Sequence, residues 1–118
     1  MFTPAPIKAL VPIAALEALD IRLGEIIAVE NVANSNKLAR LRVSFGDHTR
    51  TILAGIRKER ENPEELVGKQ TMFVINLEPK KLAGELSEGM LLDLGYADGV
   101  KPALLLPEWP MPNGARAG

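Results

Sequence analysis

The feature that most constrains this chain is a set of short segments in which apolar and polar residues alternate. Residues 21–29, 38–45 and 49–56 each follow this pattern, and a period of two residues is that of a β-strand that buries one face. The dipeptide Gly46-Asp47 separates the last two segments and is typical of a tight hairpin turn. The sequence therefore predicts antiparallel strands that share a core on one face.

The alternation also predicts which side chains point into the core. In the first segment, Gly24 is expected to permit the bend of a small barrel. The buried residues of that segment are expected to be Ile21, Leu23, Ile27 and Val29. Those of the second segment are expected to be Leu41, Val43 and Phe45. Arg40 and Arg42 alternate with them, so this strand should have a basic outer face.

Two more apolar segments, residues 71–75 and 90–94, predict a fourth and a fifth strand. Before the fourth, residues 62–68 predict a short helix, with Asn62 and Glu65 forming a capping pair. Five strands with a helix between the third and the fourth are typical of the oligonucleotide/oligosaccharide-binding (OB) barrel, which closes its sheet on itself. We therefore predict an all-β protein: a five-stranded OB-fold barrel with N- and C-terminal extensions.

The extensions flank one predicted domain, as expected for a chain of 118 residues. Residues 1–18 are expected to form an N-terminal arm and a short helix. Three prolines forbid a regular helix before residue 13, whereas the apolar spacing of residues 13–19 permits one. Residues 19–118 are expected to form the OB-fold domain, with residues 103–106 as an added short strand.

Composition removes several classes of function. The chain has no cysteine, which excludes disulfides and thiolate sites and suits a reducing compartment. It has no apolar run of membrane-spanning length and no basic leader before one, so we expect a cytoplasmic protein with no membrane insertion. The one histidine, His48, follows Asp47, and we expect their side chains to point opposite ways as in a strand. With no Gly-rich phosphate loop either, we expect no enzyme, no cofactor and no metal.

The charge balance limits how a nucleic acid can be bound. The formal net charge is −1, so RNA would have to be held by a local basic patch. Three Phe, one Tyr and one Trp are too few for general stacking on single strands. Residues 57–61 alternate in charge and are expected to form a solvated turn.

Candidate binding residues fall into two groups. The first lies in residues 76–90, an expected surface connection whose side chains are of the kind that contact phosphate and ribose. Its members are Asn76, Lys80, Lys81 and Ser87. The second group lies in the region that OB barrels use for nucleic acid. Its members are Asn36, Lys37, Arg40 and Arg42. A solvated loop and an ordinary barrel surface are the respective alternatives.

Five motifs in this chain occur in the order found in one known family. They are Leu-Asp-Ile-Arg-Leu-Gly (residues 19–24), Asn-x-Asn-Lys-Leu (34–38), Pro-Glu-Glu-Leu-x-Gly-Lys (63–69), Asn-Leu-x-Pro-x-Lys-x-x-Gly followed by Ser-x-Gly-Met (76–90), and Pro-x-x-Pro-x-Pro-Asn-Gly (107–114). Over residues 19–118 the chain thus resembles the tRNA-binding domain at the C-terminus of bacterial methionyl-tRNA synthetases. The same domain occurs in the phenylalanyl-tRNA synthetase β chain and in small stand-alone proteins, including CsaA secretion chaperones. Glu78 and Ala83 stand where the family commonly has basic residues.

The resemblance implies non-catalytic binding of structured RNA, above all tRNA, through backbone and shape contacts. Met90 would offer an apolar contact to an unstacked base, with core packing as the alternative. The resemblance also implies a homodimer formed by the N-terminal segment and an apolar C-terminal strip, although the strip could instead pack on its own barrel. The strip residues are Leu104, Leu105, Trp109 and Pro110. The alternative function is that of a CsaA-like export chaperone, which binds extended apolar peptides of unfolded proteins or preproteins in a groove at the dimer interface.

Overall fold

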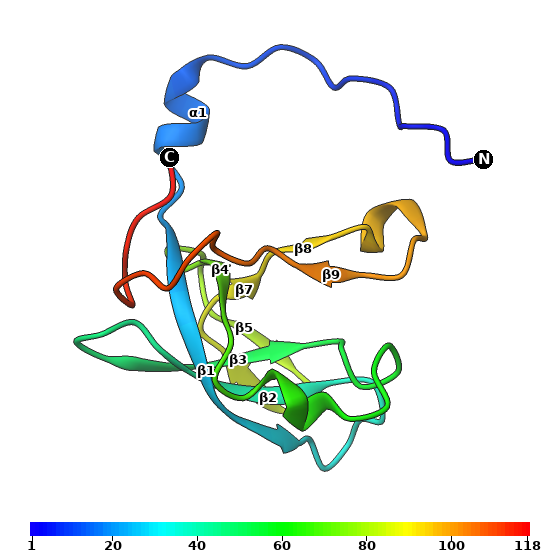
Figure 1. The fold of residues 1–118 in the computed structure, drawn as a ribbon, viewed down its shortest axis with the longest axis vertical. Helices are drawn as coiled ribbons and strands as arrows, with labels where there is room; N and C mark the ends of the chain where they lie inside the picture. Colours follow the sequence, from blue (N-terminus) through cyan, green and yellow to red (C-terminus); the bar gives the residue numbers. More distant parts are fainter.

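Five antiparallel strands form a curled, open half-barrel in the computed structural model, which describes residues 1–118 (Figure 1). Their order across the sheet is β3-β2-β1-β4-β7. The strands are β1 (Ile21–Asn31), β2 (Ala39–Ser44), β3 (Thr49–Ala54), β4 (Gln70–Val74) and β7 (Met90–Leu91). The prediction of a mostly β protein built on a curled antiparallel sheet is confirmed.

Strand β1 is long enough to serve two neighbours. Its first half pairs with β4 and its second half with β2. A β-bulge at Ile27 interrupts the pairing with β2. Ile26, opposite Val43, is fully buried in the core, whereas Ile27 is 43% exposed. The prediction that Ile27 is buried is therefore wrong, because Ile27 is the extra residue of the bulge and the core-facing positions pass from Ile26 to Val29.

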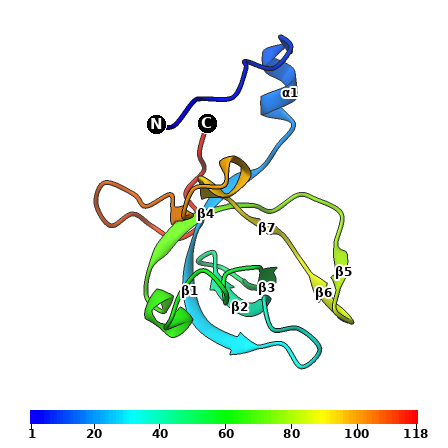
Figure 2. The same ribbon diagram turned by 90° about the vertical axis from the view of Figure 1, so that its right-hand side faces the viewer.

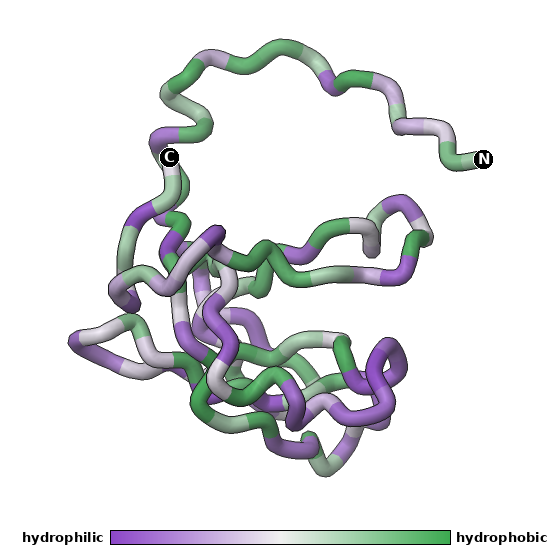
Figure 3. The backbone as a smooth tube through the Cα atoms, in the orientation of Figure 1, coloured by the Kyte–Doolittle hydropathy of each residue, from purple (hydrophilic) through white to green (hydrophobic).

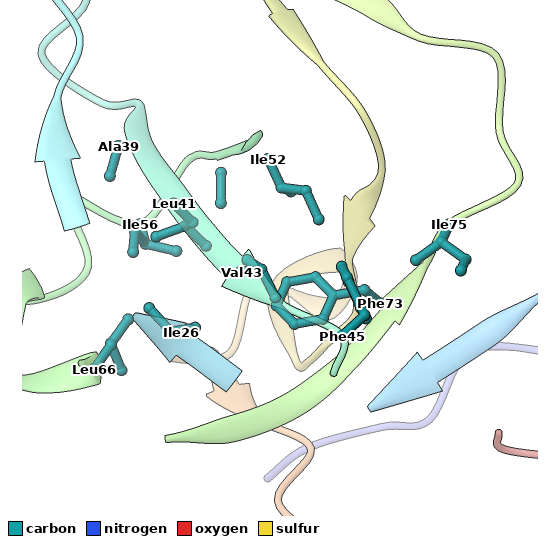
Figure 4. Close-up of a cluster of buried hydrophobic side chains, with 11 residues drawn as sticks. Ile26, Ala39, Leu41, Val43, Phe45, Ile52, Ile56, Leu66, Phe73 and Ile75 are labelled. Carbon is teal, nitrogen blue, oxygen red and sulfur yellow. The ribbon is translucent and has the colours of Figure 1, made fainter. Parts of the chain in front are cut away.

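The core lies on the concave side of the half-barrel and contains 11 buried residues (Figure 4). The side chains of Leu41, Val43 and Phe45 all belong to it, as the alternation of β2 predicts. The ring of Phe45 packs edge-on against Phe73 with centroids 5.7 Å apart. Aromatic pairs favour this geometry, so the β2 end and β4 are joined across the barrel.

Gly24 lies where β1 passes close to Val43 and the ring of Phe45. A Cβ at this position would lie 2.5 Å from Val43 Cγ1 and 2.8 Å from the Phe45 ring. No side chain fits there without moving the core, so the glycine permits close packing as well as curvature.

The segment between β3 and β4 contains one turn of 3-10 helix, η1 (Pro63–Leu66). The side chain of Asn62 makes no capping hydrogen bond, so the predicted capping pair with Glu65 is wrong. Burial holds the turn instead: Leu66 is fully buried, and the N–H of Gly68 donates to the carbonyl of Ile26 over 2.7 Å. A single turn offers little room for a capping box, and the apolar anchor takes its place.

The free edge of β3 is closed by the segment that precedes β7. The N–H of Leu53 donates to Ser87 Oγ (3.0 Å) and the N–H of Thr51 to Glu88 Oε1 (3.0 Å), while Glu88 N donates to the Thr51 carbonyl (2.9 Å). The Ser87 hydroxyl in turn donates to the carbonyl of Gly89. Side chains thus satisfy donors that a neighbouring strand would normally satisfy in a sheet.

The remaining β-structure lies outside the half-barrel. Residues 76–90, expected to be a plain connection, contain a hairpin of β5 (Lys80–Leu82) and β6 (Glu85–Ser87). Its turn has positive φ at both Ala83 and Gly84, as tight hairpins require. The predicted fifth strand is divided into β7 and β8 (Asp93–Leu94), and β8 pairs with β9 (Ala103–Leu104).

The N-terminal residues extend away from the half-barrel, through α1 (Ile13–Glu17) and an extended arm (Figures 1 and 2). Much of this arm is hydrophobic (Figure 3). Asn76 connects its base to the barrel: its Oδ1 accepts the N–H of Asp20 (2.7 Å) and its Nδ2 donates to the carbonyl of Ala18 (2.8 Å). No helix of the structure has the length and apolar character that crossing a membrane would require.

Candidate nucleic-acid interface

An open groove of about 810 Å³ runs along one side of the half-barrel. It is bordered by the β1–β2 loop, the β3–η1 connection, β5, and the segment from β7 to β9. Its apolar lining includes Leu38, Leu53, Leu91 and Leu104, whereas Lys37 and Lys80 contribute positive charge. A surface with both characters can contact the phosphates and the bases of one RNA.

The loop that carries Lys37 is held in place by its own polar groups. Ser35 Oγ accepts the N–H groups of Lys37 (3.3 Å) and Leu38 (3.1 Å), and Arg57 Nη1 donates to the Ser35 carbonyl (2.9 Å). Asn36 is exposed at the outer side of this loop. The ammonium of Lys37 is therefore presented from an ordered loop and forms no ion pair.

Lys80 and Lys81 lie on opposite faces of β5. Lys80 lines the groove together with Leu82, two residues further on, and Lys81 points to the other side of the hairpin. Both side chains are exposed and neither forms an ion pair. The two cations, which the sequence presents as a pair, are therefore available to different parts of a ligand.

The two arginines of β2 differ in availability. Arg40 makes a two-point contact with Glu85, with Nε to Oε1 and Nη2 to Oε2 both at 2.7 Å, and also reaches Glu30 (3.4 Å). The hydrogen bonds to Glu85 raise the pKa of Arg40, and those from Arg40 lower the pKa of Glu85. Arg40 thus fastens β6 to β2, whereas Arg42 is exposed with one long contact to Thr49 (3.5 Å).

Two other candidates already serve the fold. Ser87 is buried and its hydroxyl both accepts and donates a hydrogen bond within the chain. Asn76 uses its amide oxygen and nitrogen to connect the N-terminal segment. Met90 is different, because it is 47% exposed and lines the groove.

The predicted interface residues of the C-terminal strip differ in how far they are packed against the barrel. Leu104 lines the groove, and the carbonyl of Leu105 accepts a hydrogen bond from the Thr71 hydroxyl (3.2 Å). Trp109 and Pro110 are exposed beyond them, with Trp109 61% accessible. The strip is thus partly packed on its own barrel and partly open.

His48 and Asp47 do interact, contrary to expectation. His48 Nδ1 lies 2.6 Å from Asp47 Oδ1, because both residues belong to the hairpin turn and not to a flat strand. The hydrogen bond with His48 lowers the pKa of Asp47. Arg50 Nε donates to His48 Nε2 (3.1 Å). Because the turn is exposed to solvent, we interpret these contacts as stabilising the hairpin turn. No group of three acidic, His or Cys side chains capable of holding a metal ion is present.

Glu59, Asp93 and Tyr96 are among the groove residues that sequence reasoning missed. Residues 57–61 were expected to be solvated, yet Glu59 is half-buried, and burial followed by the nearby charge of Asp93 raises its pKa. Asp93 Oδ1 accepts the N–H of Tyr96 (3.1 Å). The sequence gives no sign that Glu59 lies in the groove, because the alternating charges of residues 57–61 are equally typical of a solvated turn.

Comparisons with known proteins assign the chain to a family. The family model described as "Putative tRNA binding domain" matches residues 21–116. Among solved structures, a MetRS-related protein from Pyrococcus horikoshii is 34% identical with a TM-score of 0.86, covering 94% of this chain and 100% of that one. The chaperone CsaA of Bacillus anthracis is 32% identical with a TM-score of 0.81, covering 93% of this chain and 100% of that one.

Curated relatives are much longer proteins. The methionine–tRNA ligase of Deinococcus radiodurans is 44% identical over 108 residues, which are 88% of this chain and 16% of that enzyme. That of Chlorobium chlorochromatii is 48% identical over 83 residues, which are 70% of this chain and 12% of that enzyme. The chain therefore spans a small part of the length of these relatives.

Proposed function

This chain belongs to the tRNA-binding domain family, and on that premise we propose that it is a homodimeric OB-fold protein that binds structured RNA, above all tRNA. It binds through backbone and shape contacts and catalyses no reaction. The element order supports the OB-fold assignment: five strands, with η1 between β3 and β4, curl around one core. A cytoplasmic location agrees with such a partner.

The observation that carries the proposal is a set of cations without acidic partners at the groove and on the two strands beside it. Lys37 and Lys80 line the groove, Lys81 lies on the back of β5, and Arg42 is exposed on β2. Their charges are free to neutralise phosphates, unlike that of Arg40. A chain with net charge −1 can bind RNA in this way because the cations are gathered locally.

A titration of labelled tRNA at several salt concentrations tests this function. Each phosphate contact contributes just under one unit to the slope of log affinity against log salt. With four free cations we expect a slope of roughly −3 to −4 per bound chain. A protein that binds no tRNA at low salt, or binds it equally at all salt concentrations, would contradict the proposal.

Homodimerisation is proposed from apolar surface that the single chain leaves uncovered. Ile7 and Leu10 of the arm are 96% and 97% exposed, and Trp109 of the strip is 61% exposed. Apolar surface of this extent is typical of an interface. Two chains would also present two RNA sites at once, and linked sites gain affinity through effective concentration.

Light scattering at micromolar concentration measures the oligomeric state. We expect twice the chain mass of 12.8 kDa, and a shift toward the single-chain mass in Trp109→Ala, because a large aromatic side chain at an interface centre contributes strongly. The control is Tyr96→Ala, which removes an exposed aromatic ring outside the strip. A single-chain mass for the parent across the concentration range would rule the dimer out.

A second candidate function is binding of extended apolar peptides. It is favoured by the apolar lining of the groove, to which Leu104 of the C-terminal strip contributes. It is also favoured by the similarity to proteins named as CsaA chaperones. Salt separates the two functions, because apolar peptide binding survives added salt and RNA binding weakens.

A further inference from the structure

Two carboxylates line the groove, and phosphate binding does not explain them. Glu59 comes from the β3–η1 connection and Asp93 from β8, and the groove also contains Lys37 and Lys80. In Figure 1 the β8–β9 ribbon lies above the β3–η1 connection. Residues of both segments line the groove. Carboxylates repel phosphates, so these two residues point to a part of the ligand that donates hydrogen bonds.

Glu59 has an unused capacity to accept such bonds. It is half-buried and forms no ion pair or side-chain hydrogen bond within the chain, since the neighbouring Arg60 contacts Glu65 instead (3.5 Å). Burial and the charge of Asp93 both raise its pKa. Solvent reaches its carboxylate oxygens in the free protein, and a ligand that supplies a hydrogen-bond donor takes the place of water there.

Asp93 connects the carboxylates to an aromatic ring. Its Oδ1 accepts the N–H of Tyr96 and so begins the one-turn helix η2 (Tyr96–Asp98). The Tyr96 residue is 65% exposed and lines the groove, as does Met90 at 47%. A ring beside hydrogen-bond acceptors is the arrangement with which proteins stack an unpaired base and contact its edge.

We propose that the groove binds one unpaired nucleobase of the RNA, which stacks on Tyr96 and donates its amino group to Glu59 and Asp93. The inference rests on the proposed function and adds a base preference to it. Lys37 and Lys80 are then placed to hold the flanking phosphates. Cytosine offers an amino donor at the position where uracil has a carbonyl acceptor, so the groove discriminates between these two bases.

The preference can be measured with two five-nucleotide RNAs, all-uridine and the same sequence with a central cytidine. A single well-made contact of a carboxylate to a base amino group corresponds to roughly tenfold discrimination, so we expect the cytidine RNA to bind about tenfold tighter. Glu59→Gln should reduce this ratio to about two, since an amide is a weaker acceptor and carries no charge. The isosteric Asp93→Asn, which keeps an oxygen for the Tyr96 N–H, should reduce it in the same direction.

The matched control is Glu61→Gln, which removes one negative charge from an exposed residue of the same connection outside the groove. It should leave the ratio unchanged. Equal binding of the two RNAs by the parent overturns the base preference, and so does an equal loss of preference in Glu61→Gln. Displacement of the RNA by a lysine-containing apolar peptide, dependent on Glu59, also overturns it and assigns the carboxylates to a peptide.

A parallel titration with intact tRNA keeps this inference separate from the proposed function. Salt-dependent tRNA binding without any cytidine preference refutes the base contact alone. Absence of tRNA binding at every salt concentration refutes the proposed function, and the base contact with it.

Discussion

Ser87→Ala should lower the free energy of unfolding by about 1–3 kcal/mol, the cost of leaving a buried donor without its acceptor. The donor is the N–H of Leu53, which loses Ser87 Oγ as its partner at 3.0 Å, and the Gly89 carbonyl loses a hydrogen bond too. Chemical denaturation monitored by circular dichroism gives this value. The effect is large because these contacts replace a missing strand along the β3 edge.

Ser44→Ala is the matched control. Ser44 Oγ also accepts one backbone N–H, that of Gly46 at 3.3 Å, but the contact is exposed, and water can replace it. We expect a change within about 0.5 kcal/mol. If the two alanine variants unfold at the same denaturant concentration, the closure of β3 does not depend on the Ser87 hydroxyl.

Replacement of Lys80 and Lys81 by alanine should weaken tRNA binding most at low salt. Each lysine that neutralises one phosphate contributes just under one unit of slope, so the double variant should lose roughly 1–2 units. Because the two side chains lie on opposite faces of β5, the single variants show which face meets RNA. Unfolding should move by no more than about 0.5 kcal/mol, as for other exposed side chains.

Lys58→Ala is the control for charge, since Lys58 is exposed on the β3–η1 connection and does not line the groove. It should keep the parent slope. Glu78→Lys tests the opposite change, because it adds a cation two residues before Lys80 and should tighten tRNA binding at low salt. Parent-like binding by the lysine-to-alanine variants at every salt concentration would exclude the β5–β6 hairpin as an RNA site and favour the peptide alternative.

The strand pattern could be predicted because burial on one face leaves a period of two in the sequence. Leu41, Val43 and Phe45 show it without interruption, and all three are in the core. The error at Ile27 arises from pairing, since a bulge depends on which residues of β2 lie opposite and leaves no mark in β1 alone. The sequence therefore predicts the strands better than their local register.

The candidate site could be predicted less well, for a different reason. Hydroxyl and amide side chains can bind a ligand or complete the backbone, and the sequence does not distinguish these uses. Ser87 and Asn76 complete the backbone, whereas Lys37, Lys80 and Met90 lie at the groove. Glu59 belongs to the groove only because the chain folds its connection toward β8.

The anchoring of β6 has a consequence for protein engineering. Glu85 and Ser87 fix this strand to β2 and β3, and the turn at Ala83 and Gly84 lies beyond both anchors. Ala83 lines the groove, whereas a Cβ at Gly84 would meet no atom within 4 Å, so the Gly84 side of the tip faces open space. Segments of foreign sequence can therefore be grafted at Gly84, to lengthen the hairpin or to display an epitope, while the barrel below keeps its own closure.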